Sequence, residues 1–149
     1  MQVIPYLLFN GECEEAFKFY ADCLGGNIES MMKHTGSPAE EHVPPEWRDN
    51  ILHARMTIGD SVLMASDAPP GRYQKPQGFS VPIGSRDVAE GRRIFNVLAE
   101  NGTVTMQFEK TFWAAGFGMC TDRFGIPWMV NCDNKFTTFV TEVASVAGQ

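Results

Sequence analysis

The clearest hydrophobic pattern in the chain is an alternation over residues 51–58. Apolar residues occupy the even positions Leu52, Ala54, Met56 and Ile58, and polar residues occupy the odd positions His53, Arg55 and Thr57. This period of two predicts a strand with one face against a core and the other face free for polar side chains. The run 61–66 follows directly after Gly59 and Asp60. Two strand-length runs joined by such a short turn indicate a hairpin.

Two segments have helical spacing instead. The apolar residues of the first are Cys13, Ala16, Phe17, Tyr20 and Leu24, and those of the second are Val88, Gly91, Phe95 and Leu98. Both sets share one face of a helix. We expect Asn10 and Ser85 to cap the helix starts, with Glu12, Glu14 and Glu15 favouring the first start. Gly25-Gly26 and Asn101-Gly102 are typical of helix ends.

Further strand-length runs lie at 3–9, 27–33, 79–83, 103–108, 113–121 and 126–132. The run 3–9 is almost wholly apolar, which predicts a strand covered on both faces. Residues 34–50 have no clear period and contain three prolines. They are expected to form a long, lid-like loop with one turn near 44–47.

The order strand, helix and three strands occurs twice. The segment 59–67 also aligns with 125–133 without a gap. One such unit would leave a sheet face exposed, whereas two can close over a cavity. We therefore predict an α+β fold with two βαβββ modules in tandem, about 1–67 and about 77–133. Residues 134–149 form a tail outside the repeat.

Composition narrows the class of protein. The chain has 149 residues, which suits a single domain, and 12 Lys+Arg against 18 Asp+Glu give a net charge of -6. No basic run is present, so nucleic acid is not an expected partner. Neither a membrane segment nor a secretion leader is indicated, and the chain is predicted to be cytoplasmic. Four cysteines without paired spacing are interpreted as free, mostly buried thiols.

Several segments together resemble the vicinal oxygen chelate superfamily, which includes glyoxalase I, extradiol dioxygenases and the fosfomycin and bleomycin resistance proteins. The resemblance is more specific to its PhnB-like members. The segments that carry it are 5–11, 14–20, 24–26, 53–54, 63–67 and 122–129. The resemblance implies an incompletely closed, cup-like sheet of eight strands with the helices outside. It also implies a small-molecule partner and a homodimer.

The resemblance also locates the positions at which metal-dependent members hold their ion. These positions fall on Pro5, Leu63, Phe79 and Met129, with the register of Leu63 against Met64 open by one residue. None of these side chains is a normal ligand of a divalent ion. We therefore expect no metal and no cofactor. A displaced site that joins His53 to Asp67 or to a histidine of the long loop remains an alternative.

If the helices cover the outer face, His53 and Arg55 face the cup. His53 would be the general acid or base of an enzyme, and Arg55 would orient an anionic group. The alternative is that His53 is a structural histidine and that Arg55 is one half of a buried ion pair. The other predicted wall residues are Leu63, Ala65, Asp67, Met129, Asn131 and Asp133, with Trp113 and Phe117 at the mouth. Aromatic residues at such spacing are more often plain core, which is the alternative for Trp113 and Phe117. Asp122-Arg123 is interpreted as a turn with surface pairing.

Three functional hypotheses follow. The first is a metal-free, PhnB-like protein that binds a small, partly apolar molecule. The second is an enzyme, either metal-free or a metal-dependent lyase, transferase or dioxygenase that uses a displaced site around His53. The third is an interaction protein with a vestigial cup. A methyltransferase of the usual kind is not supported, because the chain has no glycine-rich turn of the GxGxG type.

Overall fold

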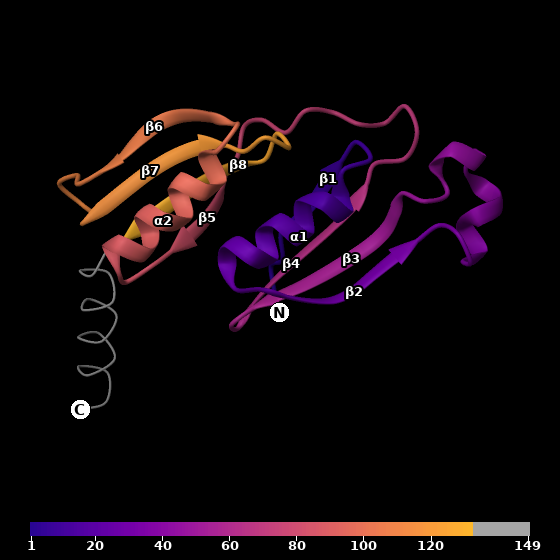
Figure 1. The fold of residues 1–149 in the computed structure, drawn as a ribbon, viewed down its shortest axis with the longest axis horizontal. Helices are drawn as coiled ribbons and strands as arrows, with labels where there is room; N and C mark the ends of the chain where they lie inside the picture. Colours follow the sequence, from indigo (N-terminus) through magenta and orange to yellow (C-terminus); the bar gives the residue numbers. More distant parts are fainter. Residues whose placement is uncertain (133–149) are drawn as a thin grey trace. The chain divides into compact units, whose positions relative to one another are not determined.

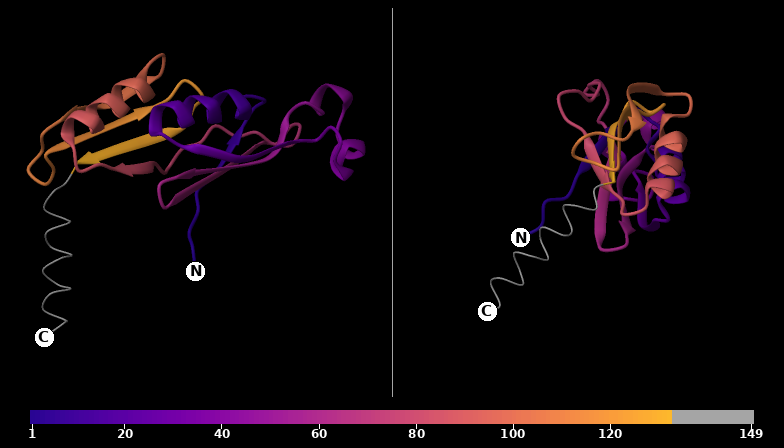
Figure 2. Two further views of the ribbon diagram at one scale, coloured as in Figure 1. Left: turned by 60° about the horizontal axis from the view of Figure 1, so that its bottom comes forward. Right: turned by 90° about the vertical axis from the view of Figure 1, so that its left-hand side faces the viewer.

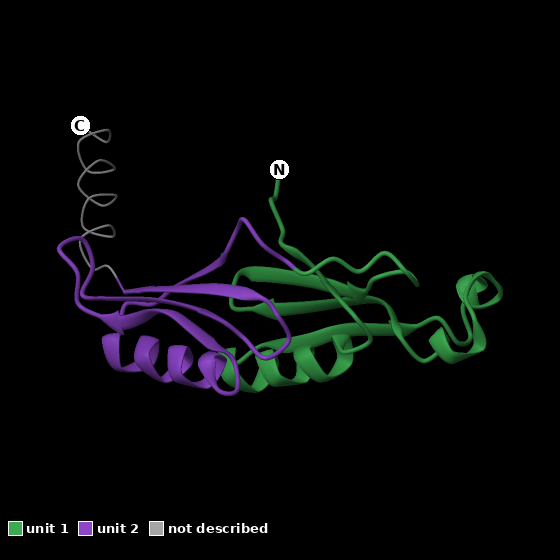
Figure 3. Ribbon diagram, turned by 90° about the horizontal axis from the view of Figure 1, so that it is seen from above, with its two compact units in different colours: residues 1–75 green, residues 76–149 purple. Residues whose placement is uncertain are grey.

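The computed structural model describes residues 1–132, which form parts of two compact units, Met1–Lys75 and Pro76–Gln149. Figure 3 colours the two units separately. Within residues 1–132 each unit contains one α-helix and one four-stranded sheet, in the order strand, helix and three strands (Figure 1). The α+β class and the tandem βαβββ modules are therefore confirmed. No helix among the described residues is long and apolar enough to cross a membrane.

The first unit has the sheet order β1-β4-β3-β2. Strand β1 runs parallel to β4, and the other neighbours are antiparallel. Its elements are β1 (Tyr6–Phe9), α1 (Cys13–Leu24), β2 (Asn27–Lys33), β3 (Ile51–Ile58) and β4 (Ser61–Asp67). The long loop holds two short 3-10 helices, Pro38–His42 and Pro45–Trp47. The second of them lies at the predicted turn, and the first was not predicted.

The second unit repeats this arrangement with the sheet order β5-β8-β7-β6. Its elements are β5 (Val81–Gly84), α2 (Val88–Ala99), β6 (Thr103–Glu109), β7 (Gly116–Thr121) and β8 (Pro127–Cys132). Strand β5 is parallel to β8. Both β5 and β7 begin later in the chain than the sequence analysis expected. The predicted tail and the proposed wall residue Asp133 lie outside the described residues.

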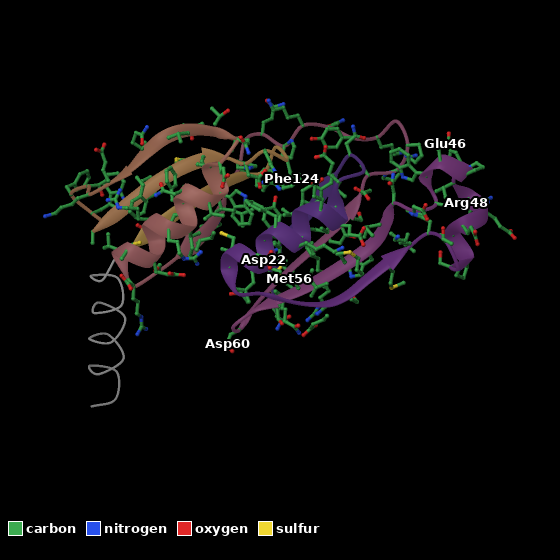
Figure 4. The ribbon with its side chains drawn as sticks, in the orientation of Figure 1. Asp22, Glu46, Arg48, Met56, Asp60 and Phe124 are labelled. Carbon is green, nitrogen blue, oxygen red and sulfur yellow. The ribbon has the colours of Figure 1, made fainter. Side chains whose placement is uncertain are left out.

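Each helix lies along one face of its own sheet (Figure 2). The buried side chains of α1 are Cys13, Ala16, Phe17, Tyr20 and Cys23. A Cβ added at Gly26 would collide with Sδ of Met56, which is labelled on β3 in Figure 4. The buried Ala54 and Met56 therefore belong to the helix-covered face of this sheet. In the second unit a Cβ added at Gly91 of α2 would collide with Sγ of Cys132 on β8.

Strand β1 is covered on one face only. Leu7 and Phe9 are buried, whereas Tyr6 is 46% exposed and Leu8 is similarly exposed. The prediction of a strand covered on both faces is therefore wrong. An apolar run does not distinguish core residues from apolar residues on an open sheet face, because both have the same composition.

The helix starts also differ from the prediction. Glu12 is the N-cap of α1, and its side chain makes no capping bond. Instead, the buried carboxylate of Asp67 accepts hydrogen bonds from the backbone N of Cys13 at 3.0 Å and of Ile51 at 2.8 Å. Asp87, and not Ser85, caps α2 by accepting from the backbone N of Ala89.

All four cysteines are free and buried, as predicted. Burial raises the pKa of the Cys13 thiol far above its ordinary value, and the nearby Asp67 carboxylate adds to this shift. Burial also raises the pKa of Cys132. These thiols therefore stay protonated and unreactive at neutral pH, which suits packing residues.

Candidate functional site

The face of each sheet that carries no helix is called its open face here. In the first unit the Cα partners Tyr6, Met64 and Arg55 form one row across β1, β4 and β3. His53 has the same parity as Arg55 and lies opposite to the buried Ala54. The open face therefore carries the side chains of Tyr6, Leu8, His53, Arg55, Met64 and Ser66.

His53 has a partner that the sequence analysis missed. The Tyr6 hydroxyl lies 3.2 Å from Nδ1 of His53, and the two rings stack with centroids 5.8 Å apart and an interplanar angle of 28°. The two residues are 47 positions apart in the chain. Only the parallel pairing of β1 with β4 brings them together, and no local pattern in the sequence signals this pairing.

Arg55 is already engaged by a carboxylate. Its Nε lies 2.9 Å from Oε2 of Glu29 on β2, and both side chains are about a third exposed or more. Such a pair contributes little to stability, because water screens the charges. Arg55 therefore has an ion-pair partner, as the alternative interpretation expected, but the pair is not buried. Its terminal guanidinium nitrogens remain available to an anionic group.

Leu63 and Asp67 lie on the helix-covered face and not on the open face where they were expected. Leu63 pairs with the buried Met56, and Asp67 binds the backbone at the start of α1. Ala65 has the same parity and is buried too. Met64 and Ser66 take the open positions instead.

Leu63 and Asp67 were assigned to the wrong face because the turn before the last strand differs in length between the two units. Gly59 and Asp60 alone join β3 to β4, whereas residues 122–126 join β7 to β8. The parallel partners show the offset, because Tyr6 pairs with Met64 and Pro82 pairs with Met129. Met129 thus corresponds to Met64, and a gapless alignment is wrong by one residue. A slip of one residue moves every side chain to the other face.

The open face of the second unit is rich in sulfur. Met106, Met119 and Met129 lie side by side as Cα partners across β6, β7 and β8. Their neighbours Trp128 and Val130 are buried on the helix-covered face. Thioether side chains give a polarisable surface that adapts to the shape of a contacting group.

Aromatic side chains adjoin this row. Phe117 on β7 is the Cα partner of Asn131 on β8, so both share the open face. The Trp113 ring lies 5.4 Å from the Phe117 ring and 4.8 Å from the Phe112 ring, both at steep angles. Four predicted wall residues, Trp113, Phe117, Met129 and Asn131, are therefore gathered on one face of one unit.

The residues at the positions where metal-dependent relatives hold their ion do not suit a metal. With Met64 in place of Leu63, the four expected metal positions are Pro5, Met64, Phe79 and Met129, none of which is an ordinary ligand of a divalent ion. The displaced site is also disfavoured, because Asp67 faces away from His53 and its carboxylate oxygens bind two backbone amides. Across residues 1–132 no three His, Cys, Asp or Glu side chains are grouped to hold an ion.

The chain matches a known protein family along most of its length. The family model described as 3-demethylubiquinone-9 3-methyltransferase matches residues 1–131. This chain belongs to that PhnB-like family. The family description names a methyl transfer, but the chain lacks the glycine-rich turn that a nucleotide-type methyl donor would need.

Three similar proteins cover nearly nine-tenths of the chain. Protein YjdN of Escherichia coli strain K12 is 38% identical over 139 residues, which cover 88% of this chain and 95% of that protein. The crystal structure of PA1353 from Pseudomonas aeruginosa is 48% identical, with a TM-score of 0.82 over 89% of this chain and 98% of that chain. A PhnB protein from Bacillus cereus is 20% identical, with a TM-score of 0.75 over 89% and 99% of the two chains.

More distant structures share the fold alone. The fosfomycin resistance protein FosX from Listeria monocytogenes is 6% identical with a TM-score of 0.62, over 90% and 93% of the two chains. A bleomycin resistance determinant encoded on Tn5 is 17% identical with a TM-score of 0.55, over 90% and 98%. The PhnB-like chain thus has the vicinal oxygen chelate fold, as its sequence segments indicated.

Proposed function

We propose that this PhnB-like protein binds a small, partly apolar molecule on the open faces of its sheets. The observation that carries the proposal is the composition of those faces, where exposed aromatic and thioether side chains surround a few polar groups. This mixture is typical of sites that bury an organic ligand and orient it by few hydrogen bonds. A small-molecule partner also suits two fold neighbours, which are named for resistance to fosfomycin and to bleomycin.

Each unit has its own proposed contact residues. His53 and Arg55 are the polar groups of the first, and Trp113, Phe117, Met129 and Asn131 belong to the second. Met64 replaces Leu63 as a contact residue, and Asp67 is assigned to the scaffold. In this proposal residues 1–149 act as one domain.

Assembly and location belong to the same proposal. Strands β2 and β6 end their sheets, and β6 is exposed at nearly every residue. Unpaired edges favour association, so a homodimer is proposed. Four free thiols suit a reducing compartment such as the cytoplasm.

Tyr6 gives His53 a defined role in this site. A hydrogen bond at Nδ1 and a stacked ring both restrict rotation of the imidazole. With Nδ1 engaged, Nε2 is the nitrogen available to a ligand, as a donor or as an acceptor according to the tautomer. The proposed site therefore has an oriented polar group on the first unit.

His53→Ala is expected to weaken ligand binding and to leave the fold intact. A library of small organic fragments, screened by ligand-observed NMR, supplies the probes. Fragments that bind the wild-type protein should lose about tenfold in affinity on His53→Ala if one hydrogen bond is lost. Tyr6→Phe, which keeps the ring and removes the hydroxyl, should show a smaller loss. The melting temperature should change little in both variants, because the two side chains lie on the open face.

The matched control is His42→Ala, which removes a histidine from the exposed part of the long loop. It should bind every fragment as the wild type does. A wild-type protein that binds no fragment would contradict the proposed function. Equal binding by wild type and His53→Ala would remove His53 from the site.

The metal-free part of the proposal has its own measurement. Elemental analysis of protein purified without added metal should find no stoichiometric zinc, nickel, manganese or iron. Adding each ion in a thermal-shift experiment should leave the melting temperature unchanged, because the expected metal positions Pro5, Met64, Phe79 and Met129 provide no hard ligands. A stoichiometric ion whose removal destabilises the protein would contradict this expectation.

A further inference from the structure

A tight turn presents two aromatic side chains beside the open face of the second unit. The backbone N of Thr111 donates to O of Ala114 at 3.1 Å, and the backbone N of Ala114 donates to Oγ1 of Thr111 at 3.0 Å. These reciprocal bonds close the turn around its two central residues. Phe112 is 91% exposed and Trp113 is 42% exposed. Large apolar rings held in water by a closed turn are costly unless something packs on them.

Two polar residues are Cα partners of Phe117 in the strand register: the exposed Glu109 on β6 and, on β8, Asn131. Its backbone O accepts from the backbone N of Ser85 at 3.0 Å, and its Cα partner on β7 is Phe117, so the position of the residue is fixed. Its side-chain Oδ1 is buried and has no hydrogen-bond partner. A buried acceptor without a donor costs free energy comparable to a lost hydrogen bond. The side chain is therefore prepared for a donor that the described residues do not supply.

We propose that Oδ1 of Asn131 accepts a hydrogen bond from a ring N–H of a planar, uncharged aromatic ligand. The flat body of the ligand packs against Trp113 and Phe117. The charge of Glu109 is exposed to water, which screens it. The buried, neutral amide oxygen of Asn131 therefore matches a neutral donor better than a cation, because a buried cation needs an opposite charge buried beside it to offset its desolvation. This inference rests on the proposed function and specifies the ligand class for one part of the site.

The methionine row extends the same surface. Met129 lies two residues before Asn131 on β8, so both side chains point to the open face, and Met119 is the Cα partner of Met129. Sulfur beside an aromatic ring is a favourable contact. A bicyclic ring system can thus touch the rings of the turn, the methionines and the Asn131 acceptor from one face of one sheet.

Indole and benzofuran test the inference, because they have nearly the same shape and differ in an N–H donor against an oxygen acceptor. Their dissociation constants can be measured by chemical-shift titration of 15N-labelled protein. Indole should bind wild-type protein about tenfold more tightly than benzofuran, as expected for one hydrogen bond to a buried acceptor. Resonances of residues around Trp113 and Asn131 should shift together.

Asn131→Leu separates a ligand contact from a structural role. The leucine keeps the approximate volume and removes the unpartnered acceptor, so the variant without ligand should melt at the same temperature as wild type or higher. It should bind indole and benzofuran equally. Asn96→Leu, on the exposed side of α2, is the matched control and should keep the preference for indole.

Three results would overturn the inference: equal affinities for the two probes in wild type, binding of neither probe, or a preference that persists in Asn131→Leu. The proposed function has a different failure. It fails when no fragment of the library binds the wild-type protein, whereas the inference alone fails when fragments bind in a His53-dependent way and indole has no advantage.

Discussion

Asp122→Ala is expected to lower the free energy of unfolding by about 3–5 kcal/mol, because three buried donors lose their acceptor. Asp122 is 3% exposed. Its Oδ1 accepts from the backbone N of Phe124 at 2.9 Å and of Ile126 at 3.0 Å, and its Oδ2 accepts from Nε1 of Trp128 at 2.8 Å. The carboxylate thus ties the β7–β8 turn to the largest fully buried side chain.

Chemical denaturation of wild type, Asp122→Ala and Asp122→Asn measures this effect. The asparagine keeps an oxygen for the two backbone amides but sets an NH2 group against the indole N–H, so its loss should be intermediate. The melting temperature of Asp122→Ala should fall by about 10–20 °C. A change in unfolding free energy below about 1 kcal/mol would show that water replaces the carboxylate at this turn.

Asp67→Ala is expected to destabilise the first unit by about 3–4 kcal/mol. The carboxylate joins the first residue of α1 to the first residue of β3, and its charge also complements the positive end of the helix. Without it, two backbone amides are left buried and unpaired. The exposed Asp22→Ala on α1, labelled in Figure 4, is the matched control and should change stability little.

Hydrogen exchange gives the Asp67 prediction a local measurement. The amides of Cys13 and Ile51 should exchange much faster in Asp67→Ala than in wild type, whereas the amides of β6 and β7 should follow the global stability alone. Unchanged protection at Cys13 and Ile51 would mean that other groups satisfy these amides. In that case Asp67 would not be the link between α1 and β3.

The local period of the sequence was enough to predict the modules. The alternation in 51–58 and the helical spacing at Cys13–Leu24 each follow from one element that buries one face. The boundaries of β3 were predicted without error. The helix caps were not, because the group that satisfies the start of α1 is Asp67, 54 residues away from Cys13.

The open-face residues were predictable only in part. His53 and Arg55 followed from parity within a single strand, whereas Leu63 and Asp67 were misplaced because the register depended on turn length. Asp122 was interpreted as a surface residue. The sequence of an Asp-Arg turn does not show whether the carboxylate faces water or, as here, the indole of Trp128. The Tyr6–His53 contact required the parallel strand pairing, which no local pattern contains.

The methionine row makes the open face of the second unit sensitive to oxidation. Oxidation of Met106, Met119 or Met129 to the sulfoxide would turn a soft apolar side chain into a polar, chiral one. Met106, 45% exposed, is the most accessible of the three to an oxidant. Oxidation by peroxide would therefore weaken the binding of an aromatic ring to this face. Methionine sulfoxide reductases would restore the thioether side chains. The same side chains that adapt to many shapes thus make the second module sensitive to oxidative damage.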